Sequence, residues 1–421
     1  MVVADTYDFG VAAFQCPHHL CPEFCHSTLH LHTVLDIRCA VRNDPVTNNS
    51  AQTHFLKGWI QLAVLIGSIF LMFLGAEGLS RLLLWKSAQA HGPKLHDLFY
   101  FDRNGLFRIK PNSRGWHRGY DERPIMVELN SDGFRGPELR ESPAKRIIFV
   151  GDSVVFDAGV QQEETFIALA EDYFERDGQD VEIINAGTPD VGVNQYWLQA
   201  KHNRFDNYKP DLIVIGLYLN DSRPPQGFLG ENQDQIIDFL SHSPLKHLAL
   251  THYVRQAYIA FQLKRGGKFT ERFEWVARYK SHKWMDNPSE FQQLVKEAQF
   301  DWGAAWNVSL ETNVFPALME LRDQYARKGV KIAVVLFPVN VQVYTKLTDS
   351  FIDYPQRQMS KFATIADIPF FDLLPSLKRQ KNLRPYADPA HLNRVGNRIT
   401  ADTIYPFLKA QLNKDSKKIE P

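Results

Sequence analysis

The sequence has very little cysteine, and what it has is confined to one end. Four of its 421 residues are cysteines, and none occurs after Cys39. The body of the chain therefore has no disulfide staple, no cysteine-ligated metal site and no thiol nucleophile. A body without cysteine is compatible with an oxidising compartment.

The chain also lacks net charge and the common nucleotide-binding motifs. Lys plus Arg and Asp plus Glu both number 48, so there is no global positive field for nucleic acid, and we predict no nucleic-acid partner. Neither G-x-G-x-x-G nor G-x4-G-K-[ST] follows the first predicted strand, which disfavours nucleotide binding. With 44% hydrophobic and 23% charged residues, the composition excludes wholesale disorder, collagen and coiled coil. At roughly 150 residues per domain, the length suggests two or three units, or one large domain with appendages.

Residues 1–57 show no pattern of a packed module. Cys16, Cys21, Cys25 and Cys39 lie here among several histidines, so a soft metal ion is one candidate ligand. Their spacing does not match the paired C-x2-C of common zinc modules. We therefore interpret this stretch as a disordered tail, or as the product of a start codon placed too far upstream, and predict no metal site.

A long apolar run follows, and we assign residues 58–86 as a transmembrane anchor. Residues 59–76 carry no charge, and a helix of that length spans about 27 Å, near the thickness of a hydrocarbon core. A buried core helix is the alternative. No small-residue cleavage site follows, so we expect an uncleaved anchor. Lys and Arg are balanced on its two sides, so the charge count does not set the orientation.

Residues 87–144, the lead-in segment, are rich in Gly, Pro, Asn and aromatics, include N-S-D-G-F-R-G at 130–136, and are expected to be irregular. Residues 145–412 then alternate apolar runs with helix-length stretches, which predicts an α/β domain whose parallel sheet is covered on both faces. The expected strands are 146–150, 181–185, 211–217, 330–337 and 368–372. The long gap before the fourth strand requires a helical insertion at about 224–306 and a crossover helix at 308–328. Residues 413–421 form a tail.

Polar residues that can do chemistry follow the strands. Ser153 comes directly after the first strand, at the start of a helix, where partial positive charge and free N–H groups are present. A serine nucleophile needs a base, and His391 can serve, with Asp388 three residues earlier holding the other ring nitrogen.

The same strand ends supply donors for an oxyanion. The backbone N–H groups of Ser153 and Gly187 and the side-chain amide of Asn220 are the candidates. Each residue has an ordinary structural alternative: a helix cap at Ser153 or His391, positive φ at Gly187, a turn at Asn220. Their order and placement together favour a catalytic site.

These blocks resemble the SGNH (GDSL-type) hydrolase superfamily: Gly151-Asp152-Ser153, Gly187, Asn220-Asp221 and Asp388-x-x-His391, over about 145–410. The lead-in motif and anchor are similar to a membrane-attached bacterial branch. The resemblance implies an α/β fold, a three-layer flavodoxin-like sandwich with a parallel sheet. It also implies no metal or other cofactor, and O-acyl ester hydrolysis or transfer on carbohydrates or lipids. It places the domain outside the cytoplasm, on the periplasmic side of a bacterial inner membrane.

This chain departs from the family pattern at three positions. Val154 replaces the name-giving leucine, Asp157 stands where membrane-attached relatives often have glycine, and Tyr218 replaces the usual glycine two residues before Asn220. The Tyr218 change puts the backbone geometry near the oxyanion in question. The intact Asp388-x-x-His391 block argues against an inactive protein.

The insertion carries four tryptophans, Trp275, Trp284, Trp302 and Trp306. Aromatic rings can stack on sugars, receive an acyl chain or meet membrane headgroups, but a helical core or lid is the favoured interpretation for most of them.

The function predicted from the sequence is a membrane-anchored serine esterase with Ser153 as nucleophile, His391 as base and Asp388 as its orienting partner. Its expected substrate is a short O-acyl ester, such as acetyl, on an envelope or exported polysaccharide, or on a lipid. Two alternatives stay open: an O-acyltransferase that uses the same residues on a glycan, and a catalytically silent glycan-binding subunit.

Overall fold

The computed structural model describes residues 48–91, 95–101, 107–119, 123–189, 191–223, 244–251, 253–254, 257 and 274–413. The cysteine cluster, most of the predicted tail 1–57, part of the predicted insertion and the end of the tail 413–421 lie outside these residues. Residues 48–57 belong to helix α1 (Asn48–His91), so the prediction of a tail up to residue 57 is wrong for its last part.

The five predicted apolar runs form one parallel sheet. Its strands are β5 (Lys145–Gly151), β6 (Val181–Gly187), β7 (Leu212–Tyr218), β8 (Lys331–Phe337) and β9 (Phe370–Asp372). They are ordered β6-β5-β7-β8-β9, and every neighbouring pair is parallel. In chain order this is 2-1-3-4-5, the flavodoxin-like arrangement. The predicted α/β class and parallel sheet are therefore confirmed.

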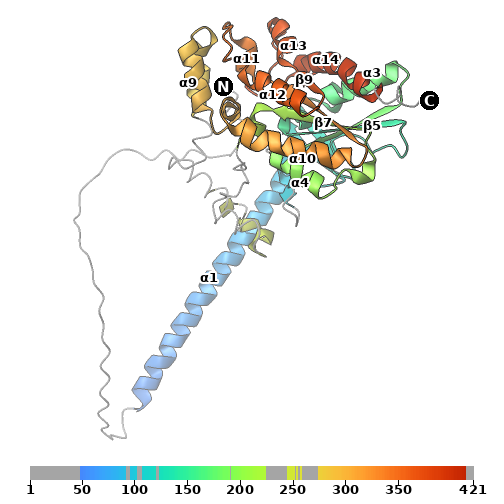
Figure 1. Ribbon diagram of the computed structural model, residues 1–421. Helices are drawn as coiled ribbons and strands as arrows, with labels where there is room; N and C mark the ends of the chain where they lie inside the picture. Colours follow the sequence, from blue (N-terminus) through green and yellow to red (C-terminus); the bar gives the residue numbers. More distant parts are fainter. Residues whose placement is uncertain are drawn as a thin grey trace.

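Helices cover both faces of the sheet (Figure 1). Helices α3 (Phe166–Arg176), α13 (Leu374–Arg379) and α14 (Arg394–Asn413) lie on one face, and α4 (Val193–Lys201), α10 (Phe315–Ala326) and α12 (Tyr354–Ile365) lie on the other. Aromatic pairs join neighbouring helices: the rings of Phe174 and Tyr405 are 4.8 Å apart, and those of Phe315 and Phe362 are 4.1 Å apart. The inner strands β7 and β8 are buried along almost their whole length, which explains why their sequences are nearly continuously apolar.

The lead-in segment is not irregular, as the sequence suggested, but contains two antiparallel pairs. After a 3₁₀ turn η2 (Leu95–Leu98), β1 (Phe99–Phe101) pairs with β2 (Phe107–Ile109), and β3 (Ser113–Arg118) pairs with β4 (Pro124–Leu129). In β4, Ile125, Val127 and Leu129 are buried while their neighbours are not. This period-2 pattern is the signal of a half-buried strand, and it was readable in the sequence.

The described part of the insertion is made of short helices. They are η6 (Pro244–His247), α8 (Trp275–Ser281), η7 (Lys283–Met285), α9 (Pro288–Glu297) and η8 (Trp302–Trp306). A π-helical turn, η9 (Leu310–Val314), then leads into α10, so the crossover helix is shorter than the predicted 308–328. Trp275, Trp284 and Trp302 are at most 4% exposed, which confirms that they are core residues.

The remaining short elements connect these layers. They are α2 (Ser153–Phe156), η3 (Gln162–Glu164), η4 (Asp206–Tyr208), η5 (Leu219–Ser222), α11 (Asn340–Tyr344) and η10 (Lys381–Leu383). Of these, α2 and η5 follow the carboxyl ends of β5 and β7, where ligands collect in a parallel sheet.

Helix α1 projects from the α/β body (Figure 1). Its stretch Lys57–Leu83 has a mean hydropathy of 2.1, with none of its most apolar window buried, and it is long and apolar enough to cross a membrane. Glu77, near the body, accepts hydrogen bonds from the N–H groups of Ala249 (2.9 Å) and Leu250 (2.8 Å). A residue of the apolar helix is thus bonded directly to the insertion.

Candidate active site

Ser153 lies on a tight turn at the end of the central strand β5. The Asp152 carboxylate caps helix α2 by accepting the N–H of Val154 at 2.8 Å. The helix packs so closely against the ends of β5 and β7 that only glycine fits there. A Cβ atom at Gly151 would lie 2.2 Å from Val155 Cγ2, and one at Gly216 would lie 2.4 Å from the same atom. As the first residue of α2, Ser153 has an N–H with no intrahelical acceptor.

The structure brings His391 and Asp388 to Ser153, although they lie more than 230 residues further along the chain. His391 Nε2 is 3.0 Å from Ser153 Oγ, and His391 Nδ1 is 2.8 Å from Asp388 Oδ2. When Nδ1–H donates to the carboxylate, Nε2 is left as an acceptor for the serine hydroxyl. The three residues, predicted from the first and the last sequence block, thus form one hydrogen-bonded chain.

The loop that carries Asp388 and His391 is fixed by its own hydrogen bonds and by α11. Asp388 Oδ1 accepts the N–H groups of Ala390 (2.8 Å) and His391 (2.7 Å). Asn340, which is 2% exposed, donates from Nδ2 to the carbonyl of Asp388 at 3.0 Å and to the hydroxyl of Tyr279 at 2.7 Å. The imidazole orientation is therefore held from two sides.

Opposite charges shape the proton affinities of the pair. Burial alone lowers the pKa of His391, but the facing Asp388 carboxylate, with smaller contributions from the charges of Asp152 and Asp157, raises that pKa to about 9. Burial would raise the pKa of Asp388, yet the facing imidazole and the two N–H donors leave it below its usual value. Asp388 therefore stays ionised and stabilises the imidazolium form.

We expect the pH profile of any reaction at Ser153 to follow His391. Only the neutral imidazole can accept the serine proton, so with a pKa of about 9 the profile of kcat/KM should rise with pH and level off above about pH 9. Measuring kcat/KM for an aryl ester from pH 5 to pH 10 tests this. A plateau already reached below pH 7 would contradict it.

Asn220 lies on the turn η5, which follows the carboxyl end of β7, the strand paired with β5. Its side chain is mostly buried, and within the described residues its amide nitrogen makes no hydrogen bond. Its Oδ1 is also buried without a partner there. An amide with no competing acceptor is a suitable donor to a developing oxyanion, together with the Ser153 N–H.

Gly187 does not fit the predicted role of a free donor. Its N–H donates to Asn185 Oδ1 at 3.0 Å, so it is already engaged. Its φ is not positive either, which also sets aside the alternative of a left-handed backbone. The glycine is required by close approach, because a Cβ atom at residue 187 would lie 2.3 Å from Phe156 N. Gly187 therefore lets α2 pack against β6.

We expect Asn220→Ala to lower kcat by about 10²–10³-fold with little change in KM, the loss found for one oxyanion donor. The matched control is Asn313→Ala, which removes a hydrogen bond to the carbonyl of Ser222 on the same turn, 3.1 Å long, without removing the donor. Steady-state kinetics on both variants tests the assignment. Equal losses in both would mean that a loosened turn, and not a missing donor, lowers the activity.

Tyr218, where the sequence suggested altered backbone geometry, has ordinary extended backbone (φ −96°, ψ 153°). Its N–H donates to Asp221 Oδ2 at 3.0 Å, and Tyr196 donates to Asp221 Oδ1 at 3.0 Å. Burial, together with nearby Asp152, holds the pKa of Asp221 well above its usual value. These hydrogen bonds to Asp221 hold the η5 turn, which contains Asn220, in place.

Sequence reasoning missed two side chains that bond the turn that begins at Ser153, Arg135 and Asn185. Asn185 Nδ2 donates to the carbonyl of Val155 at 3.0 Å, and Arg135 Nη1 donates to that of Phe156 at 2.7 Å. The N-S-D-G-F-R-G motif was noted as a turn and as part of the family resemblance, but no role was predicted for Arg135. An arginine inside a glycine-rich turn next to an α/β domain was the available signal.

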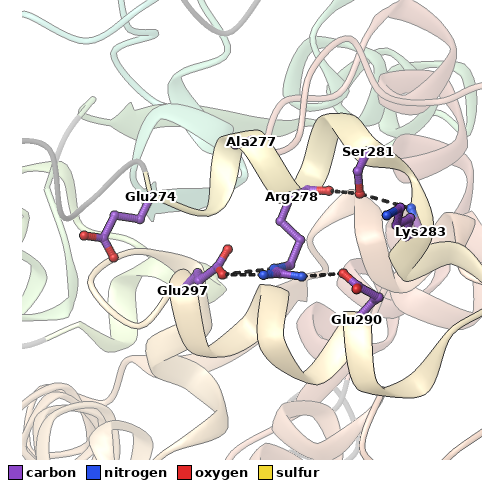
Figure 2. A pocket seen from close by; sticks show the side chains of 7 residues that line it. All are labelled: Glu274, Ala277, Arg278, Ser281, Lys283, Glu290 and Glu297. Atoms are coloured by element: carbon purple, nitrogen blue, oxygen red, sulfur yellow. Dashed lines mark hydrogen bonds and ion pairs between the residues drawn. The ribbon is translucent and has the colours of Figure 1, made fainter.

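A cavity of about 380 Å³ lies elsewhere, between α8 and α9 (Figure 2). Its lining residues are Glu274, Ala277, Arg278, Ser281, Lys283, Glu290 and Glu297. Arg278 is paired there with Glu290 and with Glu297 (2.9 Å), so its charge is already matched. We interpret this cavity as an ion-paired junction between two helices. Among the described residues, no group of three or more His, Cys, Asp or Glu is arranged to hold a metal ion.

No family model and no curated protein matches this chain. Solved structures with a similar chain path include TesA, at 15% identity over 63% of this chain and 99% of that one, with a TM-score of 0.35. An acetyl xylan esterase is 15% identical over 62% and 99%, with a TM-score of 0.34. A lipolytic protein of the G-D-S-L family from Veillonella parvula is 12% identical over 63% and 98%, with a TM-score of 0.36. Because these identities and TM-scores are low, we infer the fold and the chemistry from the strand order and the side chains of this chain alone.

Proposed function

We propose that this chain is a serine ester hydrolase of the SGNH type that is anchored in a membrane by helix α1. The observation that carries the proposal is the chain of contacts from Ser153 Oγ to His391 Nε2 (3.0 Å) and from His391 Nδ1 to Asp388 Oδ2 (2.8 Å). A nucleophile, a base within hydrogen-bond reach and a carboxylate that orients the base form the set required for acyl transfer.

The reaction proceeds in two steps. Ser153 Oγ attacks the ester carbonyl while its proton passes to His391 Nε2, and the resulting imidazolium is stabilised by Asp388. The oxyanion accepts hydrogen bonds from the Ser153 N–H and the Asn220 amide. His391 then returns the proton to the departing alcohol, which leaves an acyl ester on Ser153. In the second step water gives a proton to His391 and attacks the acyl carbonyl. His391 then returns this proton to Ser153 Oγ, and the acid is released.

The membrane anchor is supported by the composition and exposure of Lys57–Leu83. The bonds from Ala249 and Leu250 to Glu77 would hold the insertion close to the membrane end of the body. We propose the periplasmic side of a bacterial inner membrane as the location of the α/β domain. A tethered enzyme there would meet acyl esters on envelope or exported polysaccharides, or on lipids, and a short acyl group such as acetyl is the proposed substrate.

The test uses the full chain, purified in detergent, with an aryl acetate and a fluorescent fluorophosphonate. We expect turnover of the ester and labelling of wild type, and neither in Ser153→Ala. The surface variant Ser360→Ala, on α12, is the matched control and should behave as wild type. Wild type that neither hydrolyses the ester nor takes the label would reject the hydrolase and leave a silent glycan-binding subunit.

A second arm separates hydrolysis from transfer. Ester cleavage is followed with and without an oligosaccharide acceptor, and both free acid and acylated sugar are measured. We expect free acid as the main product in both cases. Acylated sugar as the main product would replace the hydrolase by an O-acyltransferase that uses the same residues.

A further inference from the structure

The helix that carries Ser153 ends in carbonyl groups that need partners. Helix α2 is a single turn, so its last carbonyls have no N–H of a following turn to bond them. Asn185 Nδ2 donates to the carbonyl of Val155 at 3.0 Å. Arg135 donates to the carbonyls of Phe156 (2.7 Å), Asp157 and Val160 (2.6 Å). Two side chains from outside the helix therefore hold the whole turn after the nucleophile.

Arg135 comes from the lead-in segment, not from the α/β domain. It forms isolated bridges to Leu129 at the end of β4 and to Asn185 in β6, and so connects the two parts. It is only 3% exposed, and its guanidinium lies 5.8 Å from the centre of the Phe156 ring. A planar fork of N–H donors can reach three carbonyls at once, which the single ammonium of lysine does less well. A cation at a helix C-terminus is also favourable.

Asp157 lies at the centre of this turn. It caps α2 in a left-handed conformation (φ 58°), and it is 1% exposed. Its Oδ2 has no hydrogen-bond partner among the described residues. Keeping a carboxylate buried is costly unless opposite charge lies nearby. The cationic groups that act on it are Arg135 and the catalytic His391.

Other groups around Asp157 come from two further elements. The Asn397 side chain of α14 favours the charged carboxylate, and Glu164 of η3 opposes it. Glu164 is itself paired with Arg394 at 2.7 Å. Burial raises the pKa of Asp157, and Arg135 and His391 oppose that rise, giving about 7. The carboxylate is thus ionised over the pH range in which His391 loses its proton.

We propose, on the basis of the function proposed above, that Arg135 and Asp157 are positioning residues of the catalytic site. Arg135 fixes the turn that presents Ser153, and the buried Asp157 carboxylate at the end of that turn stabilises positive charge on His391. Neither residue touches the ester. The lead-in segment is therefore a working part of the site.

The first test measures geometry. Arg135→Gln and Arg135→Lys are compared with Arg140→Lys, a matched control in the same segment whose partly exposed side chain pairs with Asp180. We expect kcat and the rate of fluorophosphonate labelling to fall about 10–10²-fold in Arg135→Gln, the effect of a slightly displaced nucleophile, with KM unchanged. Arg135→Lys should lie between Arg135→Gln and wild type, and Arg140→Lys should equal wild type. Wild-type kcat in Arg135→Lys and Arg135→Gln would overturn the role of Arg135.

The second test measures charge, and it does not depend on the stability of the arginine variants. In Asp157→Asn the side chain keeps its size and loses its charge. We expect the rising limb of kcat/KM against pH to move to lower pH, because the imidazolium has lost a neighbouring anion. A structural role alone would not move this limb. An unshifted limb in an active Asp157→Asn enzyme would overturn the role of Asp157.

The two proposals fail in different ways. If the wild type shows no turnover and no labelling, the hydrolase itself is rejected. If wild type and Arg140→Lys are active, and the Arg135 and Asp157 variants match them in kcat and pH profile, only the positioning pair is rejected.

Discussion

Ser153→Ala should lower kcat by about 10⁶-fold, and His391→Ala should lower it by a similar factor, because a nucleophile and its base act as a unit. Their contact at 3.0 Å is the only route by which the hydroxyl can lose its proton to the imidazole. The double variant Ser153→Ala/His391→Ala should therefore be no less active than either single variant. Both substitutions remove few atoms from a partly open site, so the fold should persist.

These losses are measured by single-turnover kinetics on an aryl acetate, with circular dichroism to check the fold. Ser360→Ala, on the surface of α12, is the control for loss of a serine hydroxyl. Additive losses in the double variant would show that the two residues act independently. Substantial activity in Ser153→Ala would show that another residue is the nucleophile.

The central sheet could be predicted because burial on both faces leaves a plain pattern in the sequence. β5 and β7 are built around runs of apolar residues, β6 is mostly apolar, and the bounds of each were predicted to within two positions. The site followed from the same logic. The carboxyl ends of parallel strands lie on the same side of a sheet, so the turns that carry Ser153 and Asn220 follow the ends of the adjacent strands β5 and β7.

The details that escaped prediction depend on competing partners. Gly187 was expected to offer its N–H to the oxyanion, but Asn185 two residues earlier already accepts it. A sequence does not show which of two acceptors a backbone donor takes, since the choice depends on distances of a few tenths of an ångström. The partners of Arg135 could not be read from the sequence either. Its guanidinium reaches its three carbonyl acceptors only when the lead-in segment is packed against β6.

The lead-in segment was misjudged for a different reason. β3 (Ser113–Arg118) carries arginine, glycine and histidine and shows no clear alternation, so its strand character comes from pairing with β4. The alternation in β4 was present, but it is short and begins with a proline. A half-buried strand such as β4 is stable only when it is paired with another strand. The sequence of its partner β3 shows no strand pattern, so the pair could not be predicted.

Asp388→Asn should lower kcat by about 10⁴-fold while leaving the loop folded. The carboxylate now accepts three hydrogen bonds: two from the N–H groups of Ala390 and His391, and one from His391 Nδ1 at 2.8 Å. An asparagine can keep the first two through its oxygen, but it then presents an NH₂ group to Nδ1. Nδ1 must become the acceptor, which puts the ring proton on Nε2, facing Ser153. The imidazole can then no longer accept the serine proton.

The pH profile separates this tautomer effect from simple loss of structure. The Asp388 charge is the main influence that raises the pKa of His391, so the remaining activity of Asp388→Asn should reach its plateau at a lower pH than that of wild type. Asp349→Asn is the matched control, because Asp349 makes the same kind of turn bond, to the N–H of Phe351 at 2.7 Å, on the protein surface. It should be fully active. If Asp388→Asn instead kept more than a tenth of wild-type kcat, orientation of the base by this carboxylate would contribute little, and the catalytic unit would reduce to Ser153 and His391.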